Sequence, residues 1–333
     1  MKKKLFIVFG MVLCMGLFGC DKKTEVSKTN TDRDTNAEGS EDTEENEKTS
    51  DTKTNDKTDT EDLAKQIEAK DVTIADGITV KFSKFEVNSQ YDSSATVIRL
   101  KDNDIAVEGE GARADGNVVT VSKEGTYVIS GKLTDGQILV EAAKTDKIQL
   151  VLNGVDVTCT NGAPLCVKSA DKTVLTLADG SVNVFTDGAN GNEEQNACVF
   201  SKDDLAVNGT GTLTVNGNYN NGIGSKNDLE IISGTVNVTA VKNGLKGNDS
   251  VAVLTGDIHI TAGKDGIKSD NDTETGKGYV YIENASITGK VGDDGIQAVN
   301  AIVFSKGTYQ VECEGKKTNC DGINEIAEDV ITE

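Results

Sequence analysis

The second half of the chain consists of short runs in which apolar and polar residues alternate. In runs such as LEIISGTVNVTA, VAVLTGDIHITA and IVFSKGTYQV, a turn that usually contains glycine divides two alternating stretches. Alternation of this kind is typical of β-strands with one face toward a core and the other toward water. Residues 72–148 show a similar strand-like pattern, punctuated by Gly and Asp. The pattern therefore predicts an all-β protein.

A short phrase recurs between these runs. It has Asn or Asp, then Gly, then Ile or Leu, as in NNGIGSKND, KNGLKGNDS, KDGIKSDND and DDGIQAVNA, with a fainter copy in CDGINEIAE. The glycines are Gly222, Gly244, Gly266, Gly295 and Gly322, so the copies are 22, 22, 29 and 27 residues apart. Such a repeat predicts stacked supersecondary units. One phrase and the run after it supply about three strands, which is one coil of a parallel β-helix.

The aliphatic position of the phrase is expected to face the core. A single coil cannot bury its own apolar face, so neighbouring coils must stack. We therefore expect an internal ladder of Ile223, Leu245, Ile267 and Ile296. Two weaker copies of the phrase, around Cys166 and Cys198, would place a cysteine at the same position.

The first 62 residues have a different composition. Residues 1–19 are typical of a secretory signal. The segment LFGC at the end of its apolar stretch is similar to a lipobox, which implies a lipid on Cys20. Residues 20–62 are acidic, rich in Thr, Asp and Glu, and too poor in apolar residues to form a core, so we expect a disordered linker. The expected body is a β-rich cap at residues 63–147 and β-helix coils at residues 148–333. This order predicts a lipid-anchored protein on the extracellular face of the bacterial cytoplasmic membrane.

The charge balance restricts the partners. The chain has 34 basic and 55 acidic residues, a formal net charge of −21. Nucleic acid is a poor partner, because its binding depends on basic patches. An acidic polysaccharide would need a cation in between. Two disulfides, Cys159 with Cys166 and Cys313 with Cys320, and burial as free thiols are both open alternatives, and nothing in the sequence specifies the oligomeric state.

The residue before the repeated glycine is expected to form a column of side-chain oxygens. Its members are Asn221, Asn243, Asp265, Asp294 and Asp321, which stacking would place about 4.8 Å apart. Adjacent asparagines can form a hydrogen-bonded ladder, whereas adjacent ionised aspartates repel and favour a bound cation. Calcium suits such oxygens, and solvated turn acids are the alternative. The predicted calcium ligands are Asp265, Asp293, Asp294, Asp321, Asn243, Asn248, Asp249, Asp270 and Asp272.

Catalytic residues are less evident. The sole histidine, His259, alternates outward, so no Ser/His/Asp triad is expected. A calcium-dependent lyase would need a base beside the metal, and Lys246 or Lys268 could serve, although each is also suited to pair with the acids. Aromatic residues for sugar stacking are scarce, since the chain has no Trp and six Tyr. The expected carbohydrate contacts are Lys242, Lys246, Lys264, Lys268 and Tyr281.

Several segments, taken in order, resemble the clostridial carbohydrate-binding β-helix family of surface lipoproteins. They include GTYVISGKL, VLNGVDVT, SKDDLAVNGTGTLTVNG, NNGIGSKNDLEIISGTVNVTA, NGLKGNDS and DGIKSDND. The resemblance implies a right-handed parallel β-helix like that of pectate lyases, bound calcium, and affinity for cellulose or acidic glycans such as polygalacturonate, without cleavage. The segment DDGIQ is similar to a lyase calcium motif, but Gln297 stands where that motif has Asp, which weakens a full lyase site. An adhesin that uses the fold as a rod is the third interpretation.

Overall fold

The computed structural model describes residues 67–332, which are mostly β-strand. The predicted signal peptide, Cys20 and the predicted linker lie outside these residues. The one helix within them is α2 (Lys84–Val87), which has four residues. No helix in this part of the chain is long or apolar enough to span a bilayer. The prediction of an all-β protein is confirmed.

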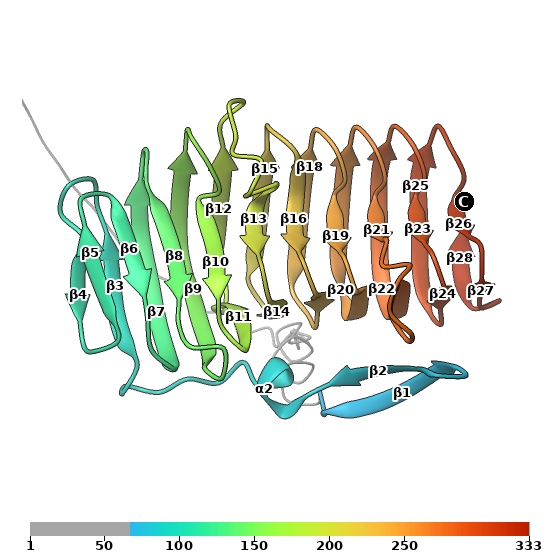
Figure 1. Cartoon of the computed structure of the whole chain (residues 1–333), viewed down its shortest axis with the longest axis horizontal. Coiled ribbons are helices and arrows are strands. Elements are labelled where there is room, and N and C mark those ends of the chain that lie inside the picture. Colours follow the sequence, from blue (N-terminus) through green and yellow to red (C-terminus); the bar gives the residue numbers. More distant parts are fainter. Residues whose placement is uncertain (1–66, 333) are drawn as a thin grey trace, which may run out of the picture. The chain divides into compact units, whose positions relative to one another are not determined.

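One of the two long sheets has ten strands, within the described part of the chain (Figure 1). All of its neighbouring strands are parallel except the antiparallel pair at one end, β5 and β6. The strands are β5 (Ala112–Asp115), β6 (Val118–Val121), β8 (Gln137–Glu141), β10 (Leu165–Ser169), β13 (Ala197–Ser201), β16 (Asn221–Ser225), β19 (Leu245–Gly247), β21 (Ile267–Ser269), β23 (Ile296–Ala298) and β26 (Thr318–Cys320).

The other long sheet has sixteen strands among residues 67–332. Its pairs are also parallel, apart from β3 with β4. The strands are β3 (Thr96–Leu100), β4 (Ala106–Glu108), β7 (Gly125–Leu133), β9 (Lys147–Cys159), β11 (Lys172–Leu177), β12 (Val182–Asp187), β14 (Asp204–Gly209), β15 (Thr212–Gly217), β17 (Asp228–Ile231), β18 (Thr235–Ala240), β20 (Ser250–Ala262), β22 (Tyr279–Val291), β24 (Ala301–Phe304), β25 (Gly307–Cys313), β27 (Ile323–Ile326) and β28 (Val330–Thr332).

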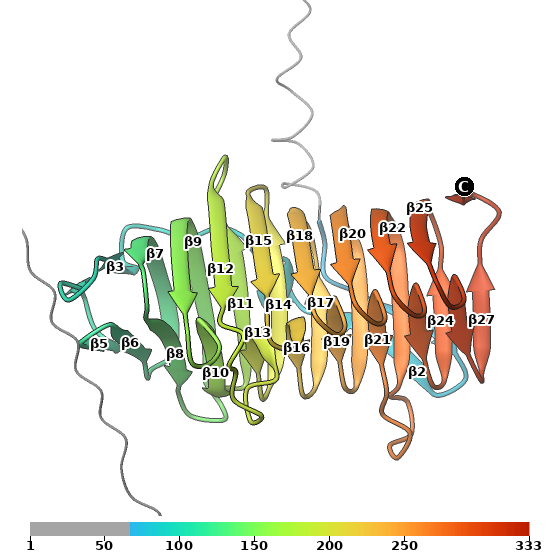
Figure 2. The same ribbon diagram turned by 90° about the horizontal axis from the view of Figure 1, so that it is seen from above.

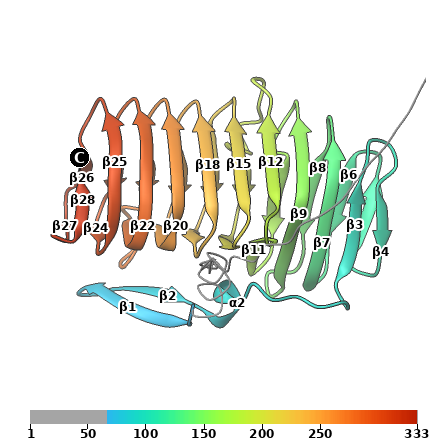
Figure 3. The ribbon, with the colours of Figure 1, turned by 180° about the vertical axis from the view of Figure 1, so that it is seen from behind.

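The chain passes repeatedly from one sheet to the other. It crosses the ten-stranded sheet in one short strand and the sixteen-stranded sheet in two strands, or in one long strand such as β20, whose halves pair with β17 and β18. We call one such passage a round. Figure 2 shows successive rounds in sequence order along the stack. In Figure 3 the strands β9, β12, β15, β18, β20, β22 and β25 lie side by side in that order.

The repeated aliphatic residues form the predicted internal ladder. Adjacent rounds place the four residues opposite one another, all fully buried: Ile223, Leu245, Ile267 and Ile296. Toward the N-terminus the ladder continues with Val199 and Leu165. The two weak copies were therefore predicted one residue out of register, because they placed Cys198 and Cys166 at this position. None of the five cysteines among residues 67–332 forms a disulfide.

Close packing explains the glycine of the phrase. A Cβ atom at Gly244 would lie 2.5 Å from Cγ2 of Ile260 and 2.7 Å from the carbonyl oxygen of Gly266 in the next round. One of these atoms belongs to a packed core side chain and the other to the backbone, so neither can move aside easily. A side chain at this position would push the two sheets apart.

The segment before the body lies against the outer face of the sixteen-stranded sheet. The strands β1 (Lys70–Ala75) and β2 (Ile78–Phe82) form an antiparallel hairpin, and Ser83 caps α2 in a capping box with Glu86. The hairpin packs Phe82 and its apolar neighbours onto Tyr281 and other outward-facing residues of β20 and β22. The sequence predicted a cap over one end of the coils, up to residue 147. The structure differs, since parallel pairing already joins β3 to β7 and β6 to β8, while the hairpin covers a side face.

Candidate metal centre

The residues before the repeated glycine form a head-to-tail column, which we call the Asx column (Asn221, Asn243, Asp265 and Asp294). In each round the Oδ1 atom accepts the backbone N–H of the same position in the next round. The N···O distances are 3.2 Å for Asn221 to Asn243, Asn243 to Asp265, and Asp265 to Asp294. Asn243 also donates its side-chain amide to Oδ1 of Asn221 at 2.9 Å. The predicted asparagine ladder is confirmed, and the aspartates continue its backbone contacts.

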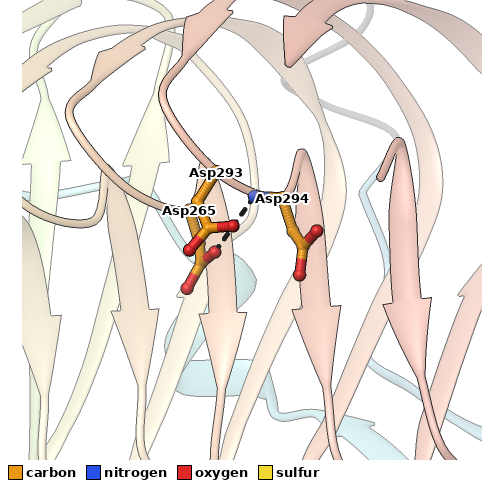
Figure 4. Close-up of side chains that lie close together, drawn as sticks. All are labelled: Asp265, Asp293 and Asp294. Carbon is orange, nitrogen blue, oxygen red and sulfur yellow. Dashed lines mark hydrogen bonds between the residues drawn. The ribbon is translucent and has the colours of Figure 1, made fainter. Parts of the chain in front are cut away.

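Three carboxylates converge where the column becomes acidic, and we call them the acid cluster (Asp265, Asp293 and Asp294). One oxygen of each lies within 4.8 Å of one oxygen of each of the others. Asp265 precedes β21, and the other two precede β23, so two adjacent rounds build the cluster. Figure 4 shows the three side chains and the bond from the Asp294 N–H to Asp265. Asp265 and Asp294 are buried, whereas Asp293 is exposed.

The charge of the cluster is only partly balanced. Oδ2 of Asp265 accepts a hydrogen bond from the Lys268 ammonium at 2.9 Å. Oδ2 of Asp294 accepts one from the Asn319 amide at 2.6 Å, and its Oδ1 accepts the backbone N–H of Lys316 at 2.8 Å. Among the described residues, no side chain pairs with Asp293. Three carboxylates thus face one ammonium, and two of the three are shielded from water.

The donor set fits a calcium ion. Calcium binds six to eight oxygen atoms at about 2.4 Å, so oxygens within 4.8 Å of one another can share one ion. Each carboxylate has about four lone-pair positions, and the hydrogen bonds above leave several of them free. A Cβ atom at Gly315 would lie 2.6 Å from Oδ1 of Asp294, so this glycine keeps the side of that carboxylate open. Water or a bound ligand would supply the remaining oxygens.

The structure does not bring the other predicted ligands into this group. Oδ1 of Asn243 is bonded within the Asx column. Asp249 pairs with Lys277 at 3.3 Å and accepts the Asn271 amide, while Asp270 pairs with Lys246 at 2.7 Å. The remaining two ligands predicted from the loops, Asn248 and Asp272, are also outside the cluster. No second group of three such ligand residues occurs among residues 67–332.

Asp321 corrects the sequence prediction. The phrase CDGINEIAE suggested that Asp321 follows Asp294 in the column, 27 residues later. In the structure Ile296 lies opposite Thr318, so the column position of that round is Lys316, 22 residues after Asp294. Asp321 is exposed and lies beyond β26, and Ile323 pairs with Ala301 of the sixteen-stranded sheet. The last DGI triplet therefore belongs to another part of the round.

The predicted carbohydrate contacts divide into three kinds. Lys242 and Lys264 are exposed. Each comes directly before a residue of the Asx column, as Asp293 does in a later round. Lys246 and Lys268 are partly buried in ion pairs with acids. Tyr281 is 3% exposed beneath Phe82, so its ring cannot stack on a sugar, which corrects that prediction.

Two residues of the site were missed from the sequence. Asn319 bonds Asp294, and Gly315 keeps its flank open. Each lies 22 residues after a position of the preceding phrase, Gln297 and Asp293 respectively. A search at this spacing, without requiring the Asx-Gly-Ile pattern, would have found both.

Comparisons with known proteins identify relatives that match most of the chain. The family described as carbohydrate-binding domain-containing protein matches residues 115–331. A protein with that description from Acetivibrio thermocellus is 44% identical over 243 residues, which is 71% of this chain and 85% of the relative. A solved structure of a polysaccharide lyase-like protein from C. thermocellum, a gadolinium derivative, superposes with a TM-score of 0.70 at 40% identity. That match covers 72% of this chain and 99% of the relative.

Proposed function

The chain belongs to the family of carbohydrate-binding domain-containing proteins, and from this premise we propose that it binds a cell-wall polysaccharide through calcium. The polysaccharide is cellulose or an acidic glycan such as polygalacturonate. The single observation that carries the proposal is the convergence of Asp265, Asp293 and Asp294 around a shared position. A calcium ion there would neutralise the carboxylates and leave coordination positions for the carboxylate of an acidic glycan or the hydroxyl oxygens of cellulose.

The proposed architecture is a right-handed parallel β-helix with the acid cluster at a corner between two rounds. In-register parallel pairing of successive rounds supports it, as does the likeness to a polysaccharide lyase-like protein.

The proposal includes a lipid anchor on Cys20 at the extracellular face of the cytoplasmic membrane. One lipid group would tether the protein, and residues 20–62 would span the distance to the wall. Metabolic labelling with a radioactive fatty acid tests the anchor. Label should enter the parent protein and be absent from a Cys20→Ala variant, and equal labelling of the two would reject it.

A polysaccharide lyase is the second candidate, since one relative is described as lyase-like. Its base would be Lys246 or Lys268. Each side chain donates to a carboxylate, to Asp270 at 2.7 Å and to Asp265 at 2.9 Å. Both ammonium groups are engaged by these carboxylates, so either lysine would have to leave its ion pair before it could reach a substrate proton, which opposes the role. Release of ultraviolet-absorbing unsaturated uronides from polygalacturonate with calcium at alkaline pH would establish a lyase.

Calcium titration calorimetry and retention on polygalacturonate test the binding function. A double variant, Asp293→Asn with Asp294→Asn, removes two charges but keeps the Oδ1 atom that Asp294 uses in the Asx column. Asn221 and Asn243 show that asparagine suits this column. We expect the calcium affinity of the double variant to fall at least tenfold and its retention on polygalacturonate to be lost. The parent protein should also lose its retention on polygalacturonate when excess chelator is present.

Asp321→Asn is the matched control. Asp321 also precedes a glycine and an isoleucine, but it is exposed and lies outside the acid cluster. This variant should bind calcium and glycan like the parent. Retention that survives chelator, or equal calcium affinity in the double variant, would reject the acid cluster as the binding site.

A further inference from the structure

A groove lies beside α2, where the segment after this helix meets the first rounds of the body. Its volume is about 450 Å³, within the range of small-ligand sites. Residues 85–96 supply much of its lining, and Glu110, residues 124–127 and Gln149 supply the rest. No member of the Asx column or of the acid cluster lines it, so the groove is separate from the proposed calcium site.

An exposed aromatic ring lines the groove. Tyr91 is 44% exposed, whereas Tyr127 and Tyr281 are buried. Phe85 also lines the groove, and its ring centroid lies 5.8 Å from Nζ of Lys147. An aromatic ring combines a large apolar face with little conformational freedom. A pyranose can place its C–H face on such a ring, and this contact requires no charge on the sugar.

Two buried amide side chains hold the wall of the groove. Nε2 of Gln149 donates to the carbonyl oxygens of Asn88 and Gln90, both at 3.4 Å. Nδ2 of Asn208 donates to the carbonyl oxygens of Glu86 at 2.7 Å and Asn88 at 3.0 Å. Both Gln149 and Asn208 are buried. An irregular wall that is fixed from below loses little conformational entropy when a ligand binds.

The charged groups of the groove select against acidic ligands. Carboxylates of Asp92, Glu110 and Glu124 line it, and no lysine or arginine is among its lining residues. Lys123 pairs with Glu110 at 3.4 Å. Ser94 donates its N–H and its hydroxyl to Asp92. These carboxylates are not close enough together to share one ion. They would repel a uronate but accept hydrogen bonds from the hydroxyls of an uncharged sugar.

We propose that this groove is a second carbohydrate site, which takes a neutral pyranose oligosaccharide without a metal ion. Tyr91 is the stacking residue, and the carboxylates and exposed amides accept and donate hydrogen bonds to the hydroxyls. Five rounds separate β9 from β22, or about 25 Å along the stack. One molecule would thus hold a calcium-bound polysaccharide and a neutral oligosaccharide at separate places.

Titration calorimetry with cellotetraose, mannotetraose and maltotetraose tests the proposal, with the full protein in excess EDTA. At least one tetrasaccharide should bind. Tyr91→Ala should weaken that binding at least tenfold, and Tyr91→Phe, which keeps the ring, should stay within about twofold of the parent. Circular dichroism melts of the variants check that the fold is retained.

The two sites can be distinguished by testing the variant of each site with the ligand of the other. Tyr91→Ala should retain calcium-dependent binding to polygalacturonate, and the Asp293→Asn, Asp294→Asn double variant should retain tetrasaccharide binding. Failure of all three tetrasaccharides to bind at millimolar concentration would overturn the second site and leave the calcium-dependent function standing. Equal tetrasaccharide affinity of Tyr91→Ala and the parent, or loss of that binding in EDTA, would also overturn it.

Discussion

Glu230 makes this fold less stable as the pH rises, whereas most acidic residues of folded proteins have the opposite effect. It lies on β17 beside the fully buried Glu86 of α2. One ammonium group, that of Lys172, serves both carboxylates and that of Asp204. Lys172 Nζ contacts Glu86 Oε1 and lies 3.5 Å from Asp204 and 3.6 Å from Glu230. Three acids therefore share one cation in a site that is largely closed to water.

Burial raises the pKa of Glu230 from 4.5 to about 7, with Lys172 opposing the shift and the nearby Asp228 and Asp204 adding to it. The folded state therefore holds the proton more tightly than the unfolded state does. The resulting stabilisation is complete below pH 4.5 and is lost as the pH rises through 7. At 1.36 kcal/mol for each pKa unit, the full contribution is about 3 kcal/mol. Burial also raises the pKa of Asp187, to about 6. Its deprotonation therefore lowers the stability of the fold as well, but at a lower pH than that of Glu230.

Glu230→Gln isolates this contribution, because glutamine resembles the protonated acid. Between pH 5 and pH 8 the parent should lose about 2–3 kcal/mol of unfolding free energy through Glu230. The variant should lack this loss and should therefore be the more stable protein at pH 8 by a similar amount. Urea unfolding at both pH values, followed by far-ultraviolet circular dichroism, measures the difference.

Glu312→Gln provides the control. Glu312 forms an exposed pair with Lys290 at 3.3 Å, so its loss should change stability by less than about 1 kcal/mol at either pH. The reasoning would be refuted if Glu230→Gln were less stable than the parent at pH 8. In that case the attraction to Lys172 would outweigh the cost of burying the charge.

Three further predictions concern the body of the fold. Ile267→Ala should lower the unfolding free energy in urea by about 2–5 kcal/mol, because Ile267 is fully buried in the ladder; a loss below 1 kcal/mol would contradict this packing. Gly244→Ala should lower the melting temperature, since its Cβ would meet Ile260 and the backbone of Gly266; an unchanged melt would contradict that clash. Burial raises the pKa of the Cys198 thiol, so a thiol reagent should modify it only after unfolding, and rapid labelling in the folded protein would disprove the burial.

The regular part of the repeat was readable from the sequence because each position has one physical role. Ile223 to Ile296 must be apolar to fill the core, and the glycine must be small to let the sheets approach. The asparagine ladder follows from stacking alone. The meeting of Asp265 with Asp294 was predictable for the same reason, since consecutive copies of a phrase place the same position in adjacent rounds.

The predictions for Asp321 and Tyr281 were wrong for physical reasons that a single copy of the repeated phrase does not reveal. The final round replaces the ladder isoleucine with Thr318 and the column residue with Lys316, so the pattern disappears while an unrelated DGI triplet follows at Asp321. Tyr281 faces outward, as alternation indicates, yet Phe82 covers it from about 200 residues away in sequence. Contacts of that separation depend on tertiary packing, which periodicity does not describe.

The head-to-tail Asx column has a consequence for how such a chain can change its length in evolution. Each side-chain oxygen bonds a backbone N–H of the next round, and every non-proline residue offers that donor. Duplication or deletion of one 22-residue unit would therefore leave the column connected. Copying the Asn243 unit adds a neutral member, whereas copying the Asp265 unit adds a carboxylate beside others. Lineages of this fold should accordingly gain length more readily among the asparagine units than among the aspartate units, where each copy adds a negative charge beside others.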